Sequence, residues 1–400
     1  MQSQLQVEEH LKLARSRSQT GLISRVGRPN TETKEEENMN ITSITKAKKI
    51  LQHQLDILWD NPERAGVVPP LMIWGPPGIG KSTFIRNLCK ENDIGFIDVR
   101  LAQREPVDIR GLPVPRDDKK GIDWIVSSEW PRADDENTPD KGIILFDEIT
   151  AADSTLQVAA YEFILDRRLG QLYEVPDGWY IVAAGNRTGD AAVARTMSSA
   201  LANRFCHLEV GSNSASWLDW ALLNNIDPRV TGFIRYMPQK LFSMEGNKER
   251  GWPSPRSWER VAMELELATE KRLDDDLMHV IVEGLIGEGA ALEFMAFLQW
   301  SGKIPDVGRM LAGEIKVKIP KRPDQRYAML SAIVHTMRQH ENPEELLNGF
   351  FDIILQFPND WAQLVHHDIT LVMDSEGKED FLEAMLEHPA HEQLEAKIIL

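Results

Sequence analysis

Short runs of apolar and β-branched residues alternate with segments of helical spacing between residues 45 and 210. The first helical segment starts at Thr45, and its apolar residues at helical spacing are Ile50, Leu51, Leu55, Ile57 and Leu58. The strand-like runs that follow are Leu71–Trp74, Phe96–Val99, Ile143–Phe146, Tyr180–Ala184 and Cys206–Val210. Runs of this length separated by helices predict an α/β fold, with a parallel five-stranded sheet covered by helices on both faces.

Beyond residue 211 the apolar spacing is helical almost throughout. Clear helical patterns cover Trp258–Leu267 and Leu277–Leu298, and a proline-containing junction over 300–320 leads to predicted helices over 325–340, 343–357 and 379–398. We therefore expect an α/β domain over 41–210, a helical domain over 211–300 and a C-terminal helical region over 301–400. Four tryptophans at helical positions are expected to fill helical cores: Trp217, Trp220, Trp258 and Trp300.

The first 40 residues differ from the rest because they contain few apolar positions. Their Gln, Ser, Arg, Thr and Glu content predicts a disordered tail over 1–40. Met39 stands directly before the first periodic segment, so that translation from Met39 would remove little folded structure. The sequence leaves open whether translation starts at Met1 or at Met39.

The composition narrows the class of protein. With 400 residues, of which 42% are hydrophobic, the chain can bury a sizeable core, yet it has no uninterrupted apolar stretch of roughly 18 to 20 residues. Only Cys89 and Cys206 are present, which excludes a disulfide framework. We expect a cytoplasmic protein without membrane association. The net charge of −17 repels polyanions and disfavours nucleic acid as a partner.

A glycine-rich segment between the first strand-like run and a helical segment carries the strongest chemical signal. It fits the pattern G-x-x-x-x-G-K-[ST], in which backbone N–H groups surround phosphates, the lysine binds the β- and γ-phosphates and the hydroxyl is a ligand for Mg²⁺. The pattern predicts ATP and Mg²⁺ as ligands, with Lys81 catalytic and Ser82 on the metal. A surface Gly/Pro turn is the alternative interpretation. The predicted phosphate loop is Gly75, Pro76, Pro77, Gly78, Ile79, Gly80, Lys81, Ser82 and Thr83.

Two adjacent acids follow the apolar run Ile143–Phe146. At the carboxyl end of a parallel strand, Asp147 is placed to hold Mg²⁺ through its water shell, and Glu148 to act as the general base on the attacking water. A strand that ends in a solvated acidic turn is the alternative, which the upstream phosphate loop disfavours.

The chain resembles the AAA+ superfamily of P-loop ATPases and, within it, the MoxR branch, which includes rubisco-activating and nitric-oxide-reductase-activating ATPases. The resemblance covers roughly residues 45–270. It implies that 41–210 is the nucleotide-binding AAA+ core and that 211–300 is its lid. The motifs that carry it, in chain order, are Gly75–Thr83, Asp147–Glu148, Ala184–Arg187, Asn203–Phe205 and Ser254–Ser257.

The resemblance implies roles for three further residues. Asn186 would position the attacking water, Arg204 would be the arginine finger that reaches the next subunit's γ-phosphate, and Arg256 would contact the γ-phosphate from the lid of the same subunit. Alternatives remain open for each of them. Asn186 could instead form a turn, and Arg256 could instead make surface contacts at the start of a helix. Arg204 could instead form a structural ion pair with an acid, in which case Arg195 or Arg187 would be the arginine finger.

Two more segments, Glu105–Pro113 and Arg167–Gly178, resemble insertions of the MoxR branch that line the pore or face a partner. Solvated turns are their alternative interpretation.

The function implied by the resemblance is Mg²⁺-dependent ATP hydrolysis in a homo-hexameric ring that remodels or activates a client protein in a chaperone-like way. A von Willebrand A-type adaptor would connect ring and client. Two alternatives of other classes are an ATP-gated assembly module with little hydrolysis and a nucleic-acid motor or helicase. The presence of Glu148 and Asn186 argues against the first, and the acidic charge argues against the second.

Overall fold

The structure is a computed structural model that describes residues 41–118, 120–190, 194–244, 250–271 and 273–399. The tail predicted over residues 1–40, including Met39, lies outside the described residues. The chain divides into two compact units, and the boundary between their described parts falls between Trp300 and Ser301. None of the described helices is long and apolar enough to cross a membrane.

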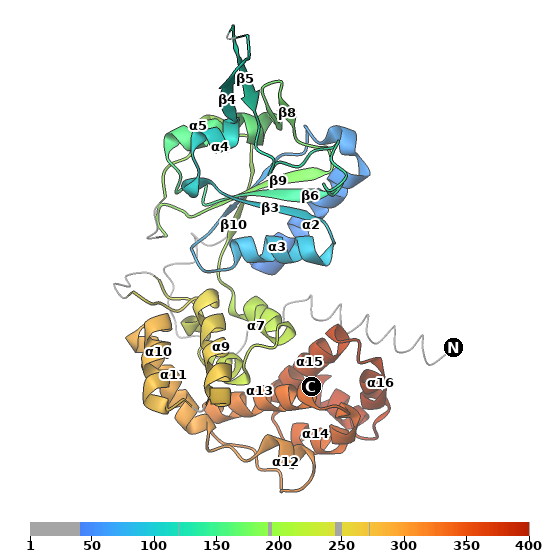
Figure 1. Ribbon diagram of the computed structural model, residues 1–400. Helices are drawn as coiled ribbons and strands as arrows, with labels where there is room; N and C mark the ends of the chain where they lie inside the picture. Colours follow the sequence, from blue (N-terminus) through green and yellow to red (C-terminus); the bar gives the residue numbers. More distant parts are fainter. Residues whose placement is uncertain (1–40, 119, 191–193, 245–249, 272, 400) are drawn as a thin grey trace, which may run out of the picture. The chain divides into compact units, whose positions relative to one another are not determined.

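A parallel sheet forms the centre of the first unit (Figure 1). The α/β class and the five predicted strands are confirmed. The predicted strand count is wrong by one, because the sixth strand has only two residues and gives no apolar run in the sequence. In spatial order the strands are β1 (Ile41–Thr42), β10 (Cys206–Val210), β2 (Leu71–Trp74), β9 (Trp179–Gly185), β6 (Gly142–Asp147) and β3 (Gly95–Arg100).

Helices cover both faces of the sheet because successive strand residues point to opposite sides. Leu71 and Ile73 pack in the core beneath α2 (Ile44–Asp60) and α3 (Lys81–Glu91). Met72, between them, belongs to the core on the other face, beneath α5 (Ser154–Asp166). Short elements complete this part of the unit, namely η1 (Pro62–Arg64), η2 (Leu101–Gln103), α4 (Pro106–Arg110) and α6 (Ser199–Ala202).

The strand order brings the ends of three central strands together. From β2 the chain crosses to the edge strand β3, returns through β6 and β9, and then passes over β2 to β10. The carboxyl ends of β2, β6 and β9 therefore lie side by side at one edge of the sheet, at a point where the direction of winding changes. Ligands of open α/β sheets bind at such a point.

Two separate hairpins overlap the segments that the sequence marked as insertions, the first of them only at Leu112 and Pro113. The first is β4 (Leu112–Pro115) with β5 (Ile122–Ile125), which stands above the sheet in Figure 1 and follows α4. The second is β7 (Arg168–Leu169) with β8 (Tyr173–Glu174). Both segments thus contain regular hydrogen-bonded structure and are more than solvated turns.

Helices make up the rest of the first unit, and an aromatic cluster fills their core. The ring of Phe233 lies 5.3 Å from Trp258, 5.2 Å from Phe294 and 5.5 Å from Phe297, centroid to centroid. Trp300 is 38% exposed, so the prediction that it fills a core is wrong. The helices are α7 (Ser214–Leu223), α8 (Pro228–Tyr236), η3 (Pro238–Lys240), α9 (Pro255–Lys271), α10 (Asp275–Ile286) and α11 (Glu288–Ser301).

Two predicted helices are each divided in two. The pattern over Leu277–Leu298 breaks at Gly287, whose φ of +80° is outside the helical region. The pattern over 379–398 breaks at His388, which precedes Pro389 and has an extended ψ of 133°. In both cases the apolar spacing continues across the break and conceals it.

The second unit is entirely helical over its described residues. A central helix, α15 (Asn359–Ser375), packs against α13, α16 and α17. It was not predicted, although Ala362, Val365, Ile369 and Val372 recur at helical spacing. The other elements are α12 (Val307–Leu311), α13 (Pro323–Gln339), η4 (Pro343–Leu346), α14 (Leu347–Ile354), α16 (Glu379–Glu387) and α17 (His391–Ile399).

Candidate functional site

The loop between β2 and α3 needs glycine at its tight positions. A Cβ atom on Gly75 would lie 2.3 Å from the carbonyl oxygen of Val210, and Gly80 has a φ of +98°, which disfavours any side chain. Gly80 is also the N-cap of α3 and offers no side chain to the N–H groups of the first turn. These N–H groups remain open to an anion, as a phosphate-binding loop requires.

Lys81 begins α3 and points back into the loop. Its Nζ donates to the carbonyl oxygens of Gly75 (2.6 Å) and Pro76 (3.0 Å) and to Oδ1 of Asn186 (3.0 Å). Asn186 follows β9, and its backbone N–H donates to Oγ1 of Thr150 at 3.0 Å. The lysine and the asparagine that the sequence predicted as separate motifs therefore meet at one point.

Two oxygen ligands suited to a hard cation lie beside the loop. The Oγ of Ser82 donates to Oδ2 of Asp147 at 2.5 Å, which joins the start of α3 to the end of β6. A hydroxyl with one carboxylate is the kind of donor set that Mg²⁺ takes when substrate phosphates and water supply its other ligands. The described residues contain no group of three or more His, Cys, Asp or Glu residues that could hold a metal without such help. The chain's residues thus fit Mg²⁺ only together with a phosphate ligand.

Glu148 stands next to this pair in an unusual backbone conformation. Its φ is +55°, in the left-handed region that costs a non-glycine residue about 1–2 kcal/mol. Its N–H donates to Oδ1 of Asp147 at 2.9 Å, and its carbonyl accepts from Ala151 at 2.8 Å. The side chain is exposed. The turn thus directs Asp147 toward Ser82 while Glu148 faces solvent.

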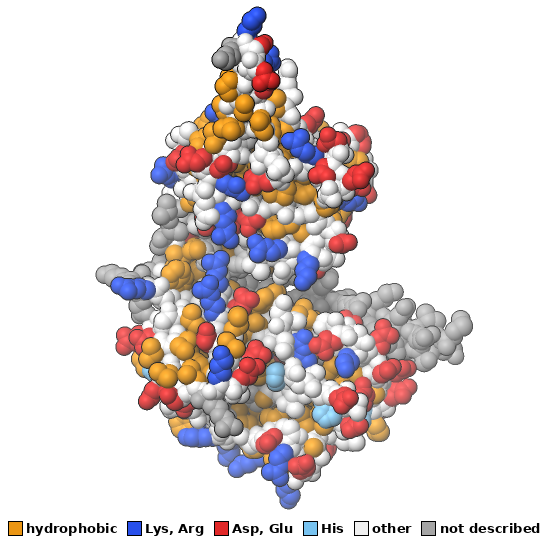
Figure 2. All heavy atoms as spheres, viewed as in Figure 1, with side chains coloured by type: hydrophobic (Ala, Val, Ile, Leu, Met, Phe, Trp, Pro, Cys, Tyr) orange, Lys and Arg blue, Asp and Glu red, His pale blue; other side chains and the backbone are white. Residues whose placement is uncertain are grey.

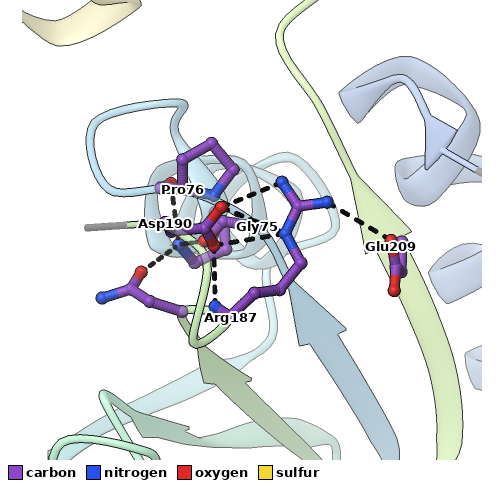
Figure 3. Close-up of polar contacts among 7 residues, drawn as sticks. Gly75, Pro76, Arg187, Asp190 and Glu209 are labelled. Atoms are coloured by element: carbon purple, nitrogen blue, oxygen red, sulfur yellow. Dashed lines mark hydrogen bonds and ion pairs between the residues drawn. The ribbon is translucent and has the colours of Figure 1, made fainter. Parts of the chain in front are cut away.

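Charges surround the buried Lys81. Burial lowers the pKa of Lys81 to about 8; the Asp147 and Asp190 carboxylates oppose this shift, and Arg256 and Arg187 add to it. Figure 3 shows Arg187 between Asp190 and Glu209, beside Gly75 and Pro76. The Nη2 atom of Arg187 lies 3.0 Å from Oδ1 of Asp190, and its Nη1 atom lies 3.3 Å from Oε2 of Glu209.

The helical part of this unit reaches the phosphate loop through the start of α9. The backbone N–H of Arg256 donates to the carbonyl oxygen of Gly78 at 3.1 Å. Ser254 and Ser257 fix this helix start by exchanging N–H to Oγ hydrogen bonds of 2.8 and 3.2 Å. The Arg256 side chain is exposed and near enough to Lys81 to affect its pKa. Arg256 therefore lies at the same loop as Lys81.

Arg204 lies at the opposite edge of the sheet. It precedes β10, whose first residue, Cys206, donates its N–H to the carbonyl oxygen of Pro70 at 2.9 Å, just before β2. β2 then runs for four residues, or about 13 Å, before it reaches Gly75. The Arg204 side chain is exposed and makes no hydrogen bond or ion pair with another described residue. The structural ion pair considered for it is absent among those residues.

The two other candidates for the finger are placed differently. Arg187 is held by Asp190 and Glu209 beside its own subunit's Lys81. Arg195 is exposed, and its backbone N–H donates to the carbonyl oxygen of Thr150 at 2.7 Å. Neither arginine lies at the edge of the sheet where Arg204 is found.

Three residues of the site were not singled out from the sequence: Thr150, Asp190 and Glu209. Thr150 holds Asn186, whereas Asp190 and Glu209 hold Arg187. Asp190 ends a turn-like run, Asn-Arg-Thr-Gly-Asp, and Glu209 lies inside a short strand. Neither pattern distinguishes these acids from ordinary surface carboxylates, because their partners come from other elements.

We expect nucleotide affinity to decrease above about pH 8. A bound phosphate favours the charged form of Lys81 and raises its pKa, so binding is fully supported below the free-state pKa of about 8. Above it, affinity should decrease by up to about tenfold per pH unit until the bound-state pKa is reached. The phosphates themselves are fully ionised in this range, since their last pKa is about 6.

Calorimetric titration of ADP between about pH 7 and about pH 9.5 measures this dependence. Lys81→Arg is the matched control, because a guanidinium keeps its charge throughout and should give a flat profile. A flat profile for the unmodified protein would contradict the low pKa of Lys81.

Comparisons with known proteins give structural likenesses at low sequence identity. No protein-family model matches the chain, and no curated protein matches it. A proposed ATPase from Cytophaga hutchinsonii shares 13% identity over 77% of this chain and 88% of its own, with a TM-score of 0.27. The RuvB Holliday junction branch migration motor of Thermotoga maritima shares 16% identity over 68% of this chain and 78% of its own, with a TM-score of 0.35. NtrX from Brucella abortus, whose structure was solved in complex with ADP, shares 14% identity over 88% of this chain and 72% of its own, with a TM-score of 0.32. TM-scores this low identify neither a family nor an activity.

Proposed function

We propose that this protein is a Mg²⁺-dependent ATPase of the AAA+ type that works as a ring and remodels or activates a client protein. The observation that carries the proposal is the meeting of Lys81, Ser82, Asp147 and Asn186 at the carboxyl edge of one sheet. Three separate chain segments supply these groups, and each group has the chemistry that a nucleoside triphosphate with Mg²⁺ requires.

The chain supplies a base for the hydrolytic step. Mg²⁺, held by Ser82 and Asp147, would neutralise phosphate charge. Glu148 is the exposed carboxylate next to this pair and takes the proton from the attacking water. The side-chain amide of Asn186, whose backbone N–H is bonded to Thr150, orients that water. The strained backbone at Glu148 supports this role, because left-handed non-glycine residues concentrate at functional sites.

The position of Arg204 supports action between subunits. Its exposed guanidinium is separated from its own phosphate loop by the length of β2, so that within one chain it lies away from the phosphates. In a closed ring of head-to-tail contacts, the amino edge of one subunit's sheet can face the neighbour's carboxyl edge. Arg204 then stabilises the transition state of the neighbour's nucleotide, and a homo-hexamer is the ring that the AAA+ resemblance implies.

The β4–β5 hairpin is the surface proposed to contact the client, either directly or through a von Willebrand A-type adaptor. Figure 2 shows apolar side chains over this hairpin at the top of the view. Leu112 is 56% exposed, Ile122 53% and Ile125 59%. Leu112 pairs with Ile125 across the two strands, so these two exposed side chains share one face of the hairpin, and Ile122 lies on the other face. Exposed apolar patches of this kind mark interaction sites.

Glu148→Gln should bind ATP with near-normal affinity but hydrolyse it about a hundredfold to ten-thousandfold more slowly, because the amide cannot accept a proton. Phosphate release and binding of a fluorescent ATP analogue measure the two properties. Asp153→Asn, a nearby helix-cap change outside the site, serves as the control. Phosphate release at the normal rate from Glu148→Gln would remove Glu148 as the base.

Mixing two inactive variants tests the ring. Arg204→Ala leaves a subunit's own phosphate loop intact, and Lys81→Ala leaves its Arg204 intact, so mixed rings should regain part of the activity that neither variant has alone. The readout is the hydrolysis rate per subunit as the two are titrated together. The specific activity of the unmodified protein should also rise with concentration as rings assemble. A mixture as inactive as its components would refute the trans role of Arg204.

Replacing both Leu112 and Ile125 by Ser should leave basal hydrolysis unchanged, because neither residue is among the hydrogen-bond partners of Lys81 and Ser82. Stimulation of hydrolysis by a permanently unfolded model polypeptide should decrease markedly. Val158→Ser, which changes a 50% exposed apolar residue on α5, is the matched control. Equal stimulation of the hairpin variant and the control would argue against the hairpin as the client contact.

A further inference from the structure

His207 of the proposed ATPase forms hydrogen bonds to two separate segments, the end of β2 and the end of α6. Its Nδ1 accepts a hydrogen bond from Nε1 of Trp74 at 2.8 Å. Its Nε2 lies 2.7 Å from the carbonyl oxygen of Ala202. The rings of Trp74 and His207 are also stacked, with centroids 5.9 Å apart and planes at 22°. Both nitrogens of an otherwise exposed imidazole are therefore committed.

The two partners of His207 border functional segments. Trp74 is the last residue of β2 and directly precedes Gly75 of the phosphate loop. Ala202 is the last residue of α6 and stands two positions before Arg204. A shallow, open depression of mixed polar and apolar character is lined by Ser199, Ala202, Asn203, Arg204, Phe205 and His207. His207 thus shares a surface with Arg204 and also contacts the strand that ends in the phosphate loop.

The direction of these bonds follows from donor chemistry. The indole N–H of Trp74 can only donate, so Nδ1 of His207 has to be an acceptor. The proton is then on Nε2 and is donated to the Ala202 carbonyl. This carbonyl is at the end of α6 and also accepts the backbone N–H of Phe205 at 3.2 Å. The imidazole therefore fixes the end of α6 against β2.

We propose that His207 is a positioning residue for Arg204: by joining Trp74 to the end of α6, it holds Arg204 in the orientation in which it reaches the neighbouring subunit's nucleotide. The proposal rests on the trans role of Arg204 proposed above. Arg204 needs such support, because its own side chain makes no hydrogen bond or ion pair with another described residue. Correct placement of a group that acts on a transition state contributes strongly to the rate, so the backbone that carries Arg204 matters.

A purely structural role for His207 is distinguishable, because the proposal assigns the effect to one side of a subunit boundary. In the mixture described above, Lys81→Ala subunits are donors, which supply Arg204, and Arg204→Ala subunits are receivers, which supply the working nucleotide site. His207→Leu placed in the donors should lower kcat about tenfold to a hundredfold with KM for ATP unchanged. The same substitution placed in the receivers should leave kcat unchanged.

Two further donor variants test the chemistry of the connection. His207→Gln should retain most of the activity, because an amide offers both an acceptor and a donor. Trp74→Phe keeps an aromatic ring but removes the N–H, and should lower kcat as His207→Leu does. Each variant is first checked for incorporation into mixed rings by native mass measurement, so that a loss of assembly is not mistaken for a loss of positioning.

Each outcome has one meaning for the proposal. A kcat loss confined to His207→Leu donors, with recovery in His207→Gln donors, is the expected result. Equal losses in donors and receivers, or no loss in donors, would overturn the positioning role while the ATPase proposal stands. If the parent mixture without any His207 substitution is inactive, the trans role of Arg204 fails first, and with it the premise of the positioning role.

Discussion

The site depends on one buried ammonium group. Lys81 is only 8% exposed, and its Nζ is held by two loop carbonyls and by the Asn186 amide. Burial destabilises the charged form, which is why its pKa is lowered to about 8. The partners of Nζ among the described residues are neutral oxygens, so the buried positive charge is not neutralised by direct contact. A bound phosphate would supply the negative charge that stabilises it. The surrounding glycines, the open N–H groups of α3 and the neighbouring acids are all arranged around that point.

The sheet separates the proposed reaction into two halves. Its carboxyl edge holds the phosphate loop, Asp147, Glu148 and Asn186, and its amino edge holds Arg204. A short strand of four residues is enough to keep these edges apart. Hydrolysis by a single chain would lack the guanidinium, so the same geometry that builds the nucleotide site argues for assembly. His207 lies near the amino end of β10 and stacks on Trp74 at the carboxyl end of the neighbouring strand β2, so this pair connects the two edges.

The exposed apolar hairpin would give the proposed ring a surface that contacts another protein. A two-stranded ribbon is at best marginally stable by itself, and this one places Leu112 against Ile125 with both side chains more than half exposed. Such a ribbon gains stability when a partner covers it. The proposed hydrolytic site and the proposed contact surface would then belong to the same subunit, so that hydrolysis could act on a client bound to the hairpin.

The sequence by itself determined the strand and helix alternation, and it located the glycine-rich loop after β2 and the two acids at the end of β6, because these depend on local spacing and on distinctive residue types. It did not determine the two-residue strand β1, the helix breaks at Gly287 and His388, or the networks of Thr150, Asp190, Glu209 and His207. Those residues have no distinctive neighbours in the chain. Their partners come from strands and helices distant in sequence, so only the packing of the sheet decides which carboxylate meets Arg187, which hydroxyl holds Asn186 and which carbonyl His207 binds.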